Sequence, residues 1–177
     1  LSLHDALPIW LIFLTDAAFN TYPDLKAKVQ IVQNSVSVAH ACGIECPKVA
    51  PVCAVEVVNP DMPATIDASL LSKMNDRGQI KGCVVDGPLA LDNALSEEAA
   101  HHKGITGPVA GKADVIMLPN IETANVMYKT LTYTSNSRNG GILVGTSAPV
   151  ILTSRADSFE TKVNSIALAA VVAESIK

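Results

Sequence analysis

Short apolar runs alternate along this chain with longer segments in which apolar residues recur at helical spacing. The apolar runs are nearly continuous, as in residues 48–55 and 113–118, which is typical of strands buried on both faces of a sheet. Alternation of such strands with helices requires parallel pairing through right-handed crossovers. The sequence therefore predicts an α/β fold with a three-layer, doubly wound, mainly parallel sheet.

Apolar spacing and helix-stop residues set the expected bounds of these elements. Gly43 follows one helical pattern, and glycine commonly stands just past a helix end. We expect strands at residues 9–14, 48–55, 82–85, 113–118, 141–144 and 150–152, and helices at 24–42, 65–77, 120–133 and from 157 onward, with mainly helix and loop between 89 and 111. In the helix at 65–77 the apolar face is formed by Ile66, Leu70 and Met74, and in the closing helix by Val163, Ile166, Ala167, Ala170 and Val171.

Composition supports a layered architecture. Apolar residues make up 49% of the 177 residues and aromatic residues only 4%, which favours α/β packing over an aromatic-rich β-sandwich. This length suffices for one domain. A net charge of −4 without any basic run argues against a nucleic-acid surface. No apolar run approaches the roughly 18 residues of a membrane span.

The four cysteines predict neither a metal site nor a disulfide framework. Cys42 and Cys46 lack the two-residue spacing of a zinc knuckle, and no second ligand pair follows. Cys53 and Cys83 lie in apolar runs, where cysteine usually acts as a small buried hydrophobe. We therefore expect free thiols in a reducing cytosol, and hence a cytoplasmic protein.

The first residues do not follow the pattern of the rest. Residues 1–8 have no clear period, and they lack the basic region and the small-residue cleavage site of a signal peptide. We interpret residues 1–8 as a leader foreign to the domain, which would then occupy residues 9–177.

One junction near the end of the chain has the features of an anion site. The apolar residues 149–152 run into a polar turn with Ser154 and Arg155, and Asp157 followed by Glu160 indicates a helix N-cap with its capping partner. Anionic ligands of open α/β sheets bind where a strand ends beside a helix N-terminus. An arginine there can hold phosphate through two parallel hydrogen bonds. The alternative is an ordinary junction whose polar residues only cap the helix and contact water.

Two aspartates follow expected strands and point to the same edge of the sheet. Asp16 ends the first strand and Asp86 the third, so both are expected at the carboxyl edge together with Ser154. Gly87 beside Asp86 would let the backbone approach a ligand closely. Each aspartate could equally be a turn or capping residue. Asn120 is most simply the cap of the helix that follows it.

Known nucleotide and hydrolase motifs are absent from the sequence. Residues 140–145 lack the G-x-G-x-x-G spacing, and there is neither a Walker lysine nor a G-x-S-x-G elbow. His101 and His102 are adjacent, so they point in different directions on a helix and are expected on its solvated face.

Four segments occur in the order found in one family of acyltransferases. They are LTDAAFN at 14–20, VDGPLALD at 85–92, GKADVIMLPNIE at 111–122 and LTSRADS at 152–158. Together they resemble the phosphate acetyl/butyryl transferase family. The last two are most similar to its phosphate butyryltransferase branch and to the transferase part of bifunctional enoyl-CoA hydratase/phosphate acetyltransferase proteins. The resemblance covers the chain from about residue 9 to its end.

The resemblance implies a reaction, an architecture and a set of site residues. Family members convert acyl-CoA and phosphate into acyl phosphate and CoA by direct transfer, with CoA as a substrate and with neither a metal nor a bound cofactor. Their architecture is similar to that of isocitrate and isopropylmalate dehydrogenases, and the full-length protein would be a homo-oligomer. Ser154 would hydrogen-bond near the thiol and carbonyl, Arg155 would hold phosphate, and Asp157 is a candidate base. The substrate-binding residues implied are Asp16, Asn20, Asp86, Asn120, Asn125 and Thr153.

The sequence departs from the family pattern at several positions. Thr161 stands where acetyl-type members carry a proposed aspartate base, and Ala17 where some members have a cysteine. Asn120 replaces a usual aspartate, and Ala124 a usual glycine. The N-terminal half of the family, which supplies further phosphate-binding arginines, has no counterpart here. We therefore expect a carboxyl-terminal portion with reduced activity, or none, on its own.

Two other functions remain open at this point. An oxidoreductase of the isocitrate or isopropylmalate dehydrogenase type would share a similar architecture, but it would need a metal-binding aspartate cluster and a nicotinamide loop, and the sequence contains neither. A non-catalytic CoA-binding or interaction module would keep the fold without the chemistry.

Overall fold

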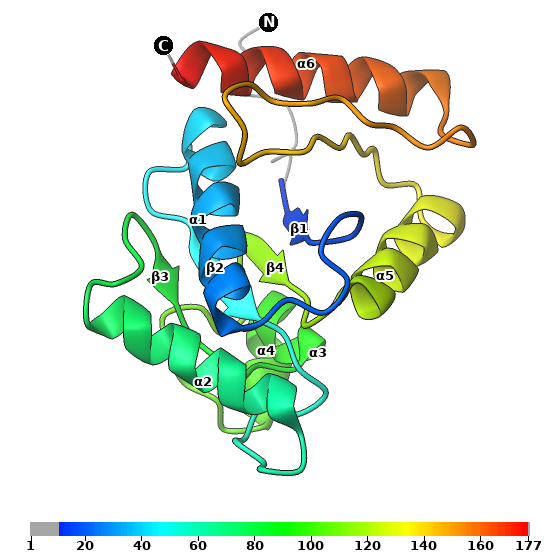
Figure 1. Cartoon of the computed structure of the whole chain (residues 1–177). Coiled ribbons are helices and arrows are strands. Elements are labelled where there is room, and N and C mark those ends of the chain that lie inside the picture. Colours follow the sequence, from blue (N-terminus) through cyan, green and yellow to red (C-terminus); the bar gives the residue numbers. More distant parts are fainter. Residues whose placement is uncertain (1–10, 177) are drawn as a thin grey trace, which may run out of the picture.

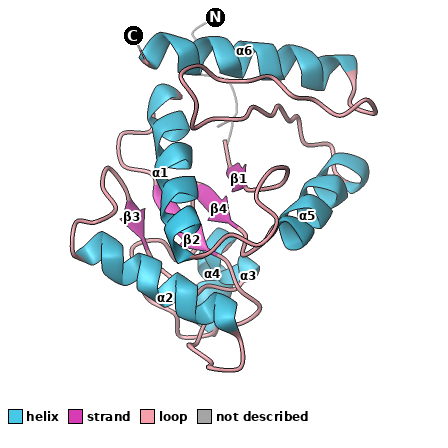
Figure 2. Cartoon of the chain, viewed as in Figure 1, coloured by secondary structure: helices cyan, strands magenta, loops and turns pink. Residues whose placement is uncertain are grey.

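The computed structural model describes residues 11–176, with a four-stranded parallel sheet at its centre (Figures 1 and 2). The strands are β1 (Phe13–Thr15), β2 (Lys48–Pro51), β3 (Val84–Val85) and β4 (Val115–Met117), in the order β1-β4-β2-β3. All three strand pairs are parallel, which confirms the predicted α/β fold. The strands are shorter than the apolar runs suggested. The expected boundary between residues 8 and 9 lies outside the described residues.

The long helices of the sheet region begin and end close to where capping residues placed them. Asp24 caps the first helix by accepting a hydrogen bond from the Ala27 N–H at 2.8 Å, and Gly43 at φ +89° follows the end of that helix. Asn120 caps the helix that follows it by accepting a hydrogen bond from the Thr123 N–H at 3.0 Å. The helices of the described residues are α1 (Leu25–Ala41), α2 (Pro63–Asp76), α3 (Leu91–Leu95), α4 (Glu97–His102), α5 (Ile121–Thr134) and α6 (Phe159–Ser175).

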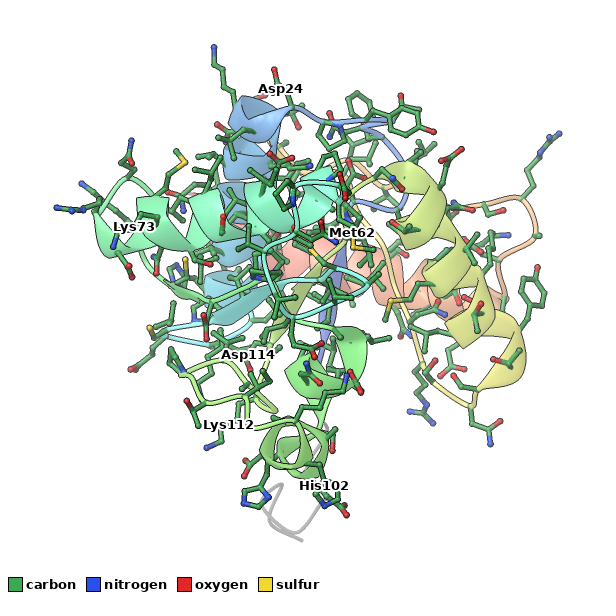
Figure 3. All side chains as sticks on the ribbon, turned by 90° about the horizontal axis from the view of Figure 1, so that it is seen from below. Asp24, Met62, Lys73, His102, Lys112 and Asp114 are labelled. Carbon is green, nitrogen blue, oxygen red and sulfur yellow. The ribbon has the colours of Figure 1, made fainter. Side chains whose placement is uncertain are left out.

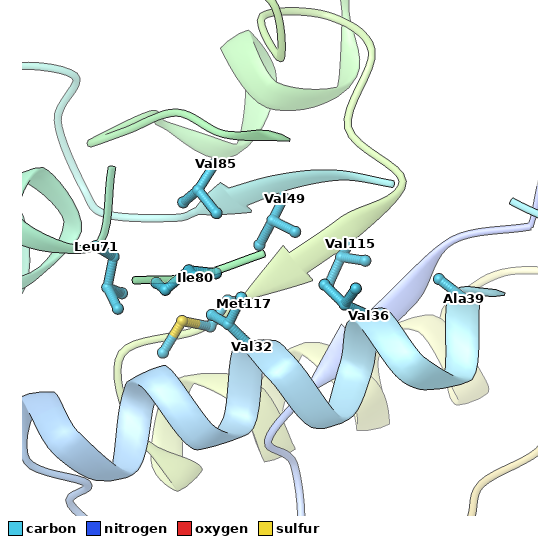
Figure 4. Packing of buried hydrophobic residues seen from close by; sticks show 9 residues of the cluster. All are labelled: Val32, Val36, Ala39, Val49, Leu71, Ile80, Val85, Val115 and Met117. Atoms are coloured by element: carbon cyan, nitrogen blue, oxygen red, sulfur yellow. The ribbon is translucent and has the colours of Figure 1, made fainter. Parts of the chain in front are cut away.

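Alternate residues of the central strands face two separate cores. Val49, Val115 and Met117 belong to a cluster with α1 and α2 on one face of the sheet (Figure 4). The intervening residues Ala50 and Ile116 belong to a second cluster, with side chains of α3 and α5 on the other face. Helices therefore cover both faces of the sheet, and this explains why the central strands are apolar at successive positions.

The buried face of α2 differs from the one its large apolar residues suggested. Ile66 and Leu70 are exposed, and the buried side chains are instead Thr65, Ala68 and Leu71. The Thr65 hydroxyl donates hydrogen bonds within the turn that starts the helix, which compensates for its burial. Neighbouring elements fixed the rotation of α2, because small residues allow a close approach to the sheet and Leu71 fills the core.

The two strands expected after α5 do not form. Residues 141–152 contain a single antiparallel bridge between Leu143 and Val150, whose backbones exchange two hydrogen bonds of 2.8 Å. Ile151 and Leu152 are exposed. These residues have the composition of a strand, but the described residues place no neighbouring strand beside them. The expectation of a sheet strand running into Ser154 is therefore wrong.

The last helix begins later, and faces the other way, than its pattern suggested. Its N-cap is Ser158, which accepts from the Thr161 N–H at 3.1 Å, and not Asp157. Figure 1 shows α6 (red) lying across one end of the molecule, above the orange segment that precedes it. The residues of α6 that pack inward are Thr161, Ser165, Ala169 and Val172, whereas the expected apolar face of Val163, Ile166, Ala167, Ala170 and Val171 is exposed.

Candidate functional site

The loop after β1 is organised by the carboxylate of Asp16. One oxygen of Asp16 accepts hydrogen bonds from the N–H groups of Ala18 and Phe19 at 3.0 and 3.1 Å. The other oxygen accepts from the Asn20 N–H at 2.8 Å and from its side-chain amide at 2.6 Å. Burial alone raises the pKa of Asp16, but these hydrogen bonds outweigh it and hold the pKa below its ordinary value. Asp16 and Asn20 therefore shape this loop together.

Asp86 follows β3 and has the opposite electrostatic character. Half-burial raises the pKa of Asp86, and the negative charge of Asp76 raises it further. A hydrogen bond from the Gly87 N–H lowers this pKa but does not outweigh the other two effects. The side chain of Asp86 lies so close to Gly107 that a Cβ at position 107 would overlap an Asp86 carboxylate oxygen. This acid therefore holds a proton more readily than Asp16 and is packed tightly against backbone.

The two aspartates lie at opposite ends of the predicted edge. Both follow parallel strands, so both stand at the carboxyl edge of the sheet, as expected. In the order β1-β4-β2-β3, however, their strands are the two outermost. At a strand spacing of about 4.8 Å, the ends of β1 and β3 are about 14 Å apart.

Helix α5 connects the loop after β1 to the turn that contains Ser154. The side-chain amide of Asn125 donates to the Ala17 carbonyl at 2.9 Å. One helical turn further on, the Tyr128 hydroxyl donates to a carboxylate oxygen of Asp157 at 3.2 Å. Burial, together with the charge of Asp157, raises the pKa of Tyr128, so this hydroxyl remains a donor at neutral pH. Sequence reasoning missed Tyr128, although its position three residues after Asn125 places it on the same side of α5.

The Ser154 turn is closed by Asp157. The second Asp157 oxygen accepts from the Ser154 N–H at 2.7 Å, and the Asp157 N–H donates back to the Ser154 carbonyl at 3.1 Å. The Ser154 hydroxyl accepts from the Ala156 N–H at 3.3 Å. Arg155 at the tip is exposed, and none of the ion pairs between residues 11 and 176 includes it. The turn thus presents a guanidinium beside the start of α6, with Thr153 half-buried behind it.

The sequence-predicted residues therefore form one connected group and one outlier. Asp16, Asn20 and Asn125 are joined through the loop after β1, and Asn125 is joined through α5 to Asp157 and Ser154. Asn120 begins the same helix, where its side chain serves as a cap, as expected. Asp86 stands apart from this group at the far end of the sheet edge.

A buried ion pair at the carboxyl edge was not predicted. The Lys28 ammonium lies 2.5 Å from an Asp67 oxygen and joins α1 to α2, and Lys28 is only 6% exposed. The pair lines a cavity with Pro51, Cys53 and Pro119 that is large enough for about one water molecule. Burial raises the pKa of the Cys53 thiol to about 11 despite the nearby Lys28 charge, so this thiol stays protonated. A single lysine in an amphipathic helix gives no sequence signal of burial.

The remaining chemical groups add no further site. All four cysteines are free. Residues 11–176 contain no group of three or more His, Cys, Asp or Glu side chains that could hold a metal ion. His101 and His102 are exposed on α4, and Figure 3 shows His102 at the rim of the molecule. In the part of the chain that the structure describes, none of the helices has both the length and the apolar character needed to cross a membrane.

Comparison with known proteins places this chain in one class of protein. A family model described as phosphate acetyl/butaryl transferase matches residues 7–170. The chain therefore belongs to the phosphate acetyl/butyryl transferase family, which confirms the resemblance carried by the four sequence segments.

Particular relatives sharpen this assignment. Phosphate butyryltransferase of Clostridium acetobutylicum is 80% identical over 163 residues, which is 92% of this chain and 54% of the relative. Phosphate acetyltransferase of Thermotoga maritima is 55% identical over 162 residues, which is 92% of this chain and 55% of the relative. A branched-chain phosphotransacylase from Enterococcus faecalis matches in structure with a TM-score of 0.83 at 40% identity, over 90% of this chain and 58% of the other. The chain thus spans about half the length of the curated relatives it matches.

Proposed function

We propose that this chain is part of an acyltransferase that moves an acyl group between CoA and inorganic phosphate. The observation that carries the proposal is the 80% identity to a phosphate butyryltransferase over 92% of the chain. The exposed Arg155, on a turn held by Asp157 and Tyr128, supplies a physical basis for it. A guanidinium beside a helix N-terminus suits a phosphate group.

The proposed reaction needs charge stabilisation more than covalent chemistry from the protein. A phosphate oxygen attacks the thioester carbon, the carbonyl oxygen becomes an oxyanion, and collapse of this intermediate breaks the C–S bond. CoA then leaves as a thiolate, which is protonated because a free thiol has a pKa of about 8.5. In this proposal Arg155 orients phosphate, and Ser154 hydrogen-bonds the carbonyl or the sulfur as charge develops there.

We assign Asp157 a positioning part in this mechanism. Both of its oxygens accept hydrogen bonds, from Tyr128 and from the Ser154 backbone, and these bonds hold the turn. Thr161 cannot act as a base in its place, since its hydroxyl donates to Asn139 at 2.9 Å and its backbone belongs to the cap of α6. Phosphate is itself an anion, so correct placement beside the thioester supplies much of the rate enhancement.

The other expected residues enter the proposal through their positions. We assign substrate binding near Ser154 to the residues Asp16, Asn20, Asn120, Asn125 and Thr153, and substrate binding at the far end of the sheet edge to Asp86. The complete protein is proposed to be a cytoplasmic homo-oligomer of dehydrogenase-like architecture that uses CoA and phosphate as substrates and needs no bound cofactor.

A second candidate is a module that binds CoA without catalysing transfer. The observation in its favour is that Thr161 stands where acetyl-type members carry a proposed aspartate base, and its hydroxyl is engaged with Asn139. The dehydrogenase alternative has no such observation in its support.

The test joins this chain to the part of the Clostridium acetobutylicum relative that it does not match. Phosphate-dependent release of CoA thiol from butyryl-CoA is expected from the joined protein. Arg155→Ala should lower the rate by about 10²-fold or more, the scale of a lost electrostatic donor at a reacting centre. Arg155→Lys should lower the rate less than Arg155→Ala does, because lysine keeps the positive charge although it lacks the planar guanidinium group that can make two parallel hydrogen bonds. CoA binding without any turnover would favour the binding module, and a near-unchanged rate for a folded Arg155→Ala protein would contradict the phosphate role.

A further inference from the structure

The segment that follows α5 lies against the inward side of α6, and in Figure 1 it runs from the end of α5 (yellow) alongside that helix. The side-chain amide of Asn164 donates to the Asn139 carbonyl at 3.0 Å, and the Gly141 N–H donates to the Ser165 hydroxyl at 2.9 Å. Between these bonds, a Cβ at Gly140 would lie only 2.9 Å from the Asn164 backbone. Ser165 is fully buried. The inward side of α6 is therefore polar because it binds backbone groups of this segment.

The side chain of Asn139 connects the ends of the two helices. Its oxygen accepts from the hydroxyl of Thr161 in the first turn of α6 at 2.9 Å. Its amide nitrogen donates to the hydroxyl of Thr132 in the last turn of α5 at 3.2 Å. The Thr132 hydroxyl in turn donates to the Tyr128 carbonyl at 2.8 Å, so it needs a donor from Asn139. An amide can accept at one end and donate at the other, which suits asparagine to this place.

These hydrogen bonds close a ring around the turn that carries the proposed phosphate-binding arginine. On the α5 side, Tyr128 donates to Asp157 through its hydroxyl and is bonded through its carbonyl to Thr132. On the α6 side, Ser158 follows Asp157 directly and caps the first turn of the helix. Asn139 joins the two sides, so the start of α6 is fixed relative to α5 at both ends of the ring.

We propose that Asn139 is a positioning residue for the acyl transfer, which fixes the start of α6 beside α5 and thereby the placement of Arg155. The inference rests on the proposed function and deepens it, because Asn139 itself touches no substrate in this role. A guanidinium holds phosphate through two directed hydrogen bonds only when the turn that carries it is fixed. Misplacement of a reacting group by about 1 Å can lower a rate by about 10²-fold.

The test uses the joined protein described above and measures steady-state kinetics against each substrate. Asn139→Ala should lower kcat/KM for phosphate at least about tenfold, with part of the loss in the KM for phosphate, and should change the KM for butyryl-CoA less than about twofold. Asn136→Ala is the matched control, since it makes the same substitution at an exposed asparagine of the same segment, and its kinetics should stay within about twofold of the unaltered protein. A merely structural role would lower the melting temperature of Asn139→Ala and leave the kinetics of the folded protein unchanged.

Variants of Thr161 test the same hydrogen bond from its other side, and they decide the matter if Asn139→Ala does not fold. Thr161→Val removes the hydroxyl and should reproduce the kinetic loss of Asn139→Ala, and the double variant should lose no more than either single variant. Thr161→Ser keeps the hydroxyl and should retain at least about half of the activity. Additive losses in the double variant would show that the two residues do not act through their shared bond, and would overturn the proposal.

Amide hydrogen exchange supplies a measurement that does not depend on turnover. Asn139→Ala should accelerate exchange at Ser154 and Asp157, and Asn136→Ala should not. Unchanged exchange at both amides, or equal kinetics of Asn139→Ala and Asn136→Ala, overturns the positioning role and leaves the proposed function standing. Absence of phosphate-dependent turnover from the unaltered joined protein refutes the proposed function itself. The two failures are therefore distinguishable.

Discussion

The sheet and the C-terminal segment are built from similar amino acids but differ in how completely their apolar side chains are buried. Around the sheet, Val49, Val115 and Ile116 are fully buried between helices on both faces. From residue 143 onward, equally apolar residues such as Leu152 and Ile166 remain in contact with solvent. The difference teaches that an apolar pattern specifies a buried face only where a partner surface is present. Four predictions follow in order of decreasing effect, and each compares two groups whose surroundings differ.

The largest contrast is expected between a leucine in the sheet core and an isoleucine on α6. Leu71→Ala removes a side chain that is 1% exposed and should lower the free energy of unfolding by about 2–5 kcal/mol. Ile166→Ala on the outer side of α6 should change it by less than about 0.5 kcal/mol, as at other surface sites. Urea denaturation followed by circular dichroism measures both. Equal losses would show that α6 is packed in solution on its outer side as well.

The second contrast is between an ion pair that joins two helices and an ion pair within a single helix. Lys28→Ala leaves the Asp67 carboxylate half-buried without its partner and should cost about 2 kcal/mol or more. Lys73→Ala breaks the exposed Lys73–Asp76 pair on α2 and should cost no more than about 0.5 kcal/mol. Thermal unfolding of both variants provides the comparison. A Lys28→Ala protein as stable as the Lys73→Ala protein would mean that the inner pair is solvated.

The third prediction tests the connection between the two regions. Tyr128→Phe removes the hydroxyl that donates to Asp157 and should cost about 1 kcal/mol, the usual contribution of one hydrogen bond. Because the turn is otherwise held only locally, the loss should appear as faster amide hydrogen exchange at Ser154 and Asp157. The exchange of Val115 and Ile116 in the sheet should be unchanged. Uniform acceleration throughout the chain would contradict a local role.

The smallest effect concerns pH and the two aspartates of the carboxyl edge. The lowered pKa of Asp16 means that its contribution to stability is present above its unfolded pKa of about 3.9 and is lost as the pH falls through its folded pKa. The raised pKa of Asp86 has the opposite sign, so its contribution is greatest at low pH and is lost as the pH rises through its folded pKa.

Asparagine substitutions separate these contributions. Asp16→Asn should make stability less sensitive to acidification, and Asp86→Asn should make it more sensitive, because the remaining carboxylates then act alone. Melting temperatures measured from about pH 3 to about pH 7 give the two slopes relative to the unaltered protein. Slopes that shift in the same direction would contradict the assignment of opposite environments.

Local signals predicted the sheet region well. The cap Asn120 and the stop at Gly43 are short-range features, and each is found where the sequence placed it. Near-continuous apolar runs also predicted helices on both faces of the sheet. The rotation of α2 was not predictable in this way, because Thr65 and Ala68 are buried by contacts with distant segments that a single helical pattern does not contain.

The candidate site was only partly predictable for the same reason. The segments around Asp16 and Ser154 were recognised, but the link between them passes through Tyr128, and a tyrosine in a helix has no feature that indicates a partner in another segment. Residues 149–152 were expected to form a strand from composition alone. A strand also needs a hydrogen-bonding neighbour, and the sequence of one segment does not reveal whether that neighbour is present.

Helix α5 has a mechanical consequence for the two loops it connects. Asn125 donates a hydrogen bond to the Ala17 carbonyl, and Tyr128 donates one to Asp157. Three residues of helix separate Asn125 from Tyr128 by about 4.5 Å along the helix axis. A helix resists stretching far more than a loop does, so α5 fixes the distance between the two loops. Any displacement of the loop after β1 that carries Asn125 with it must also displace the Ser154 turn, unless the Tyr128–Asp157 hydrogen bond breaks.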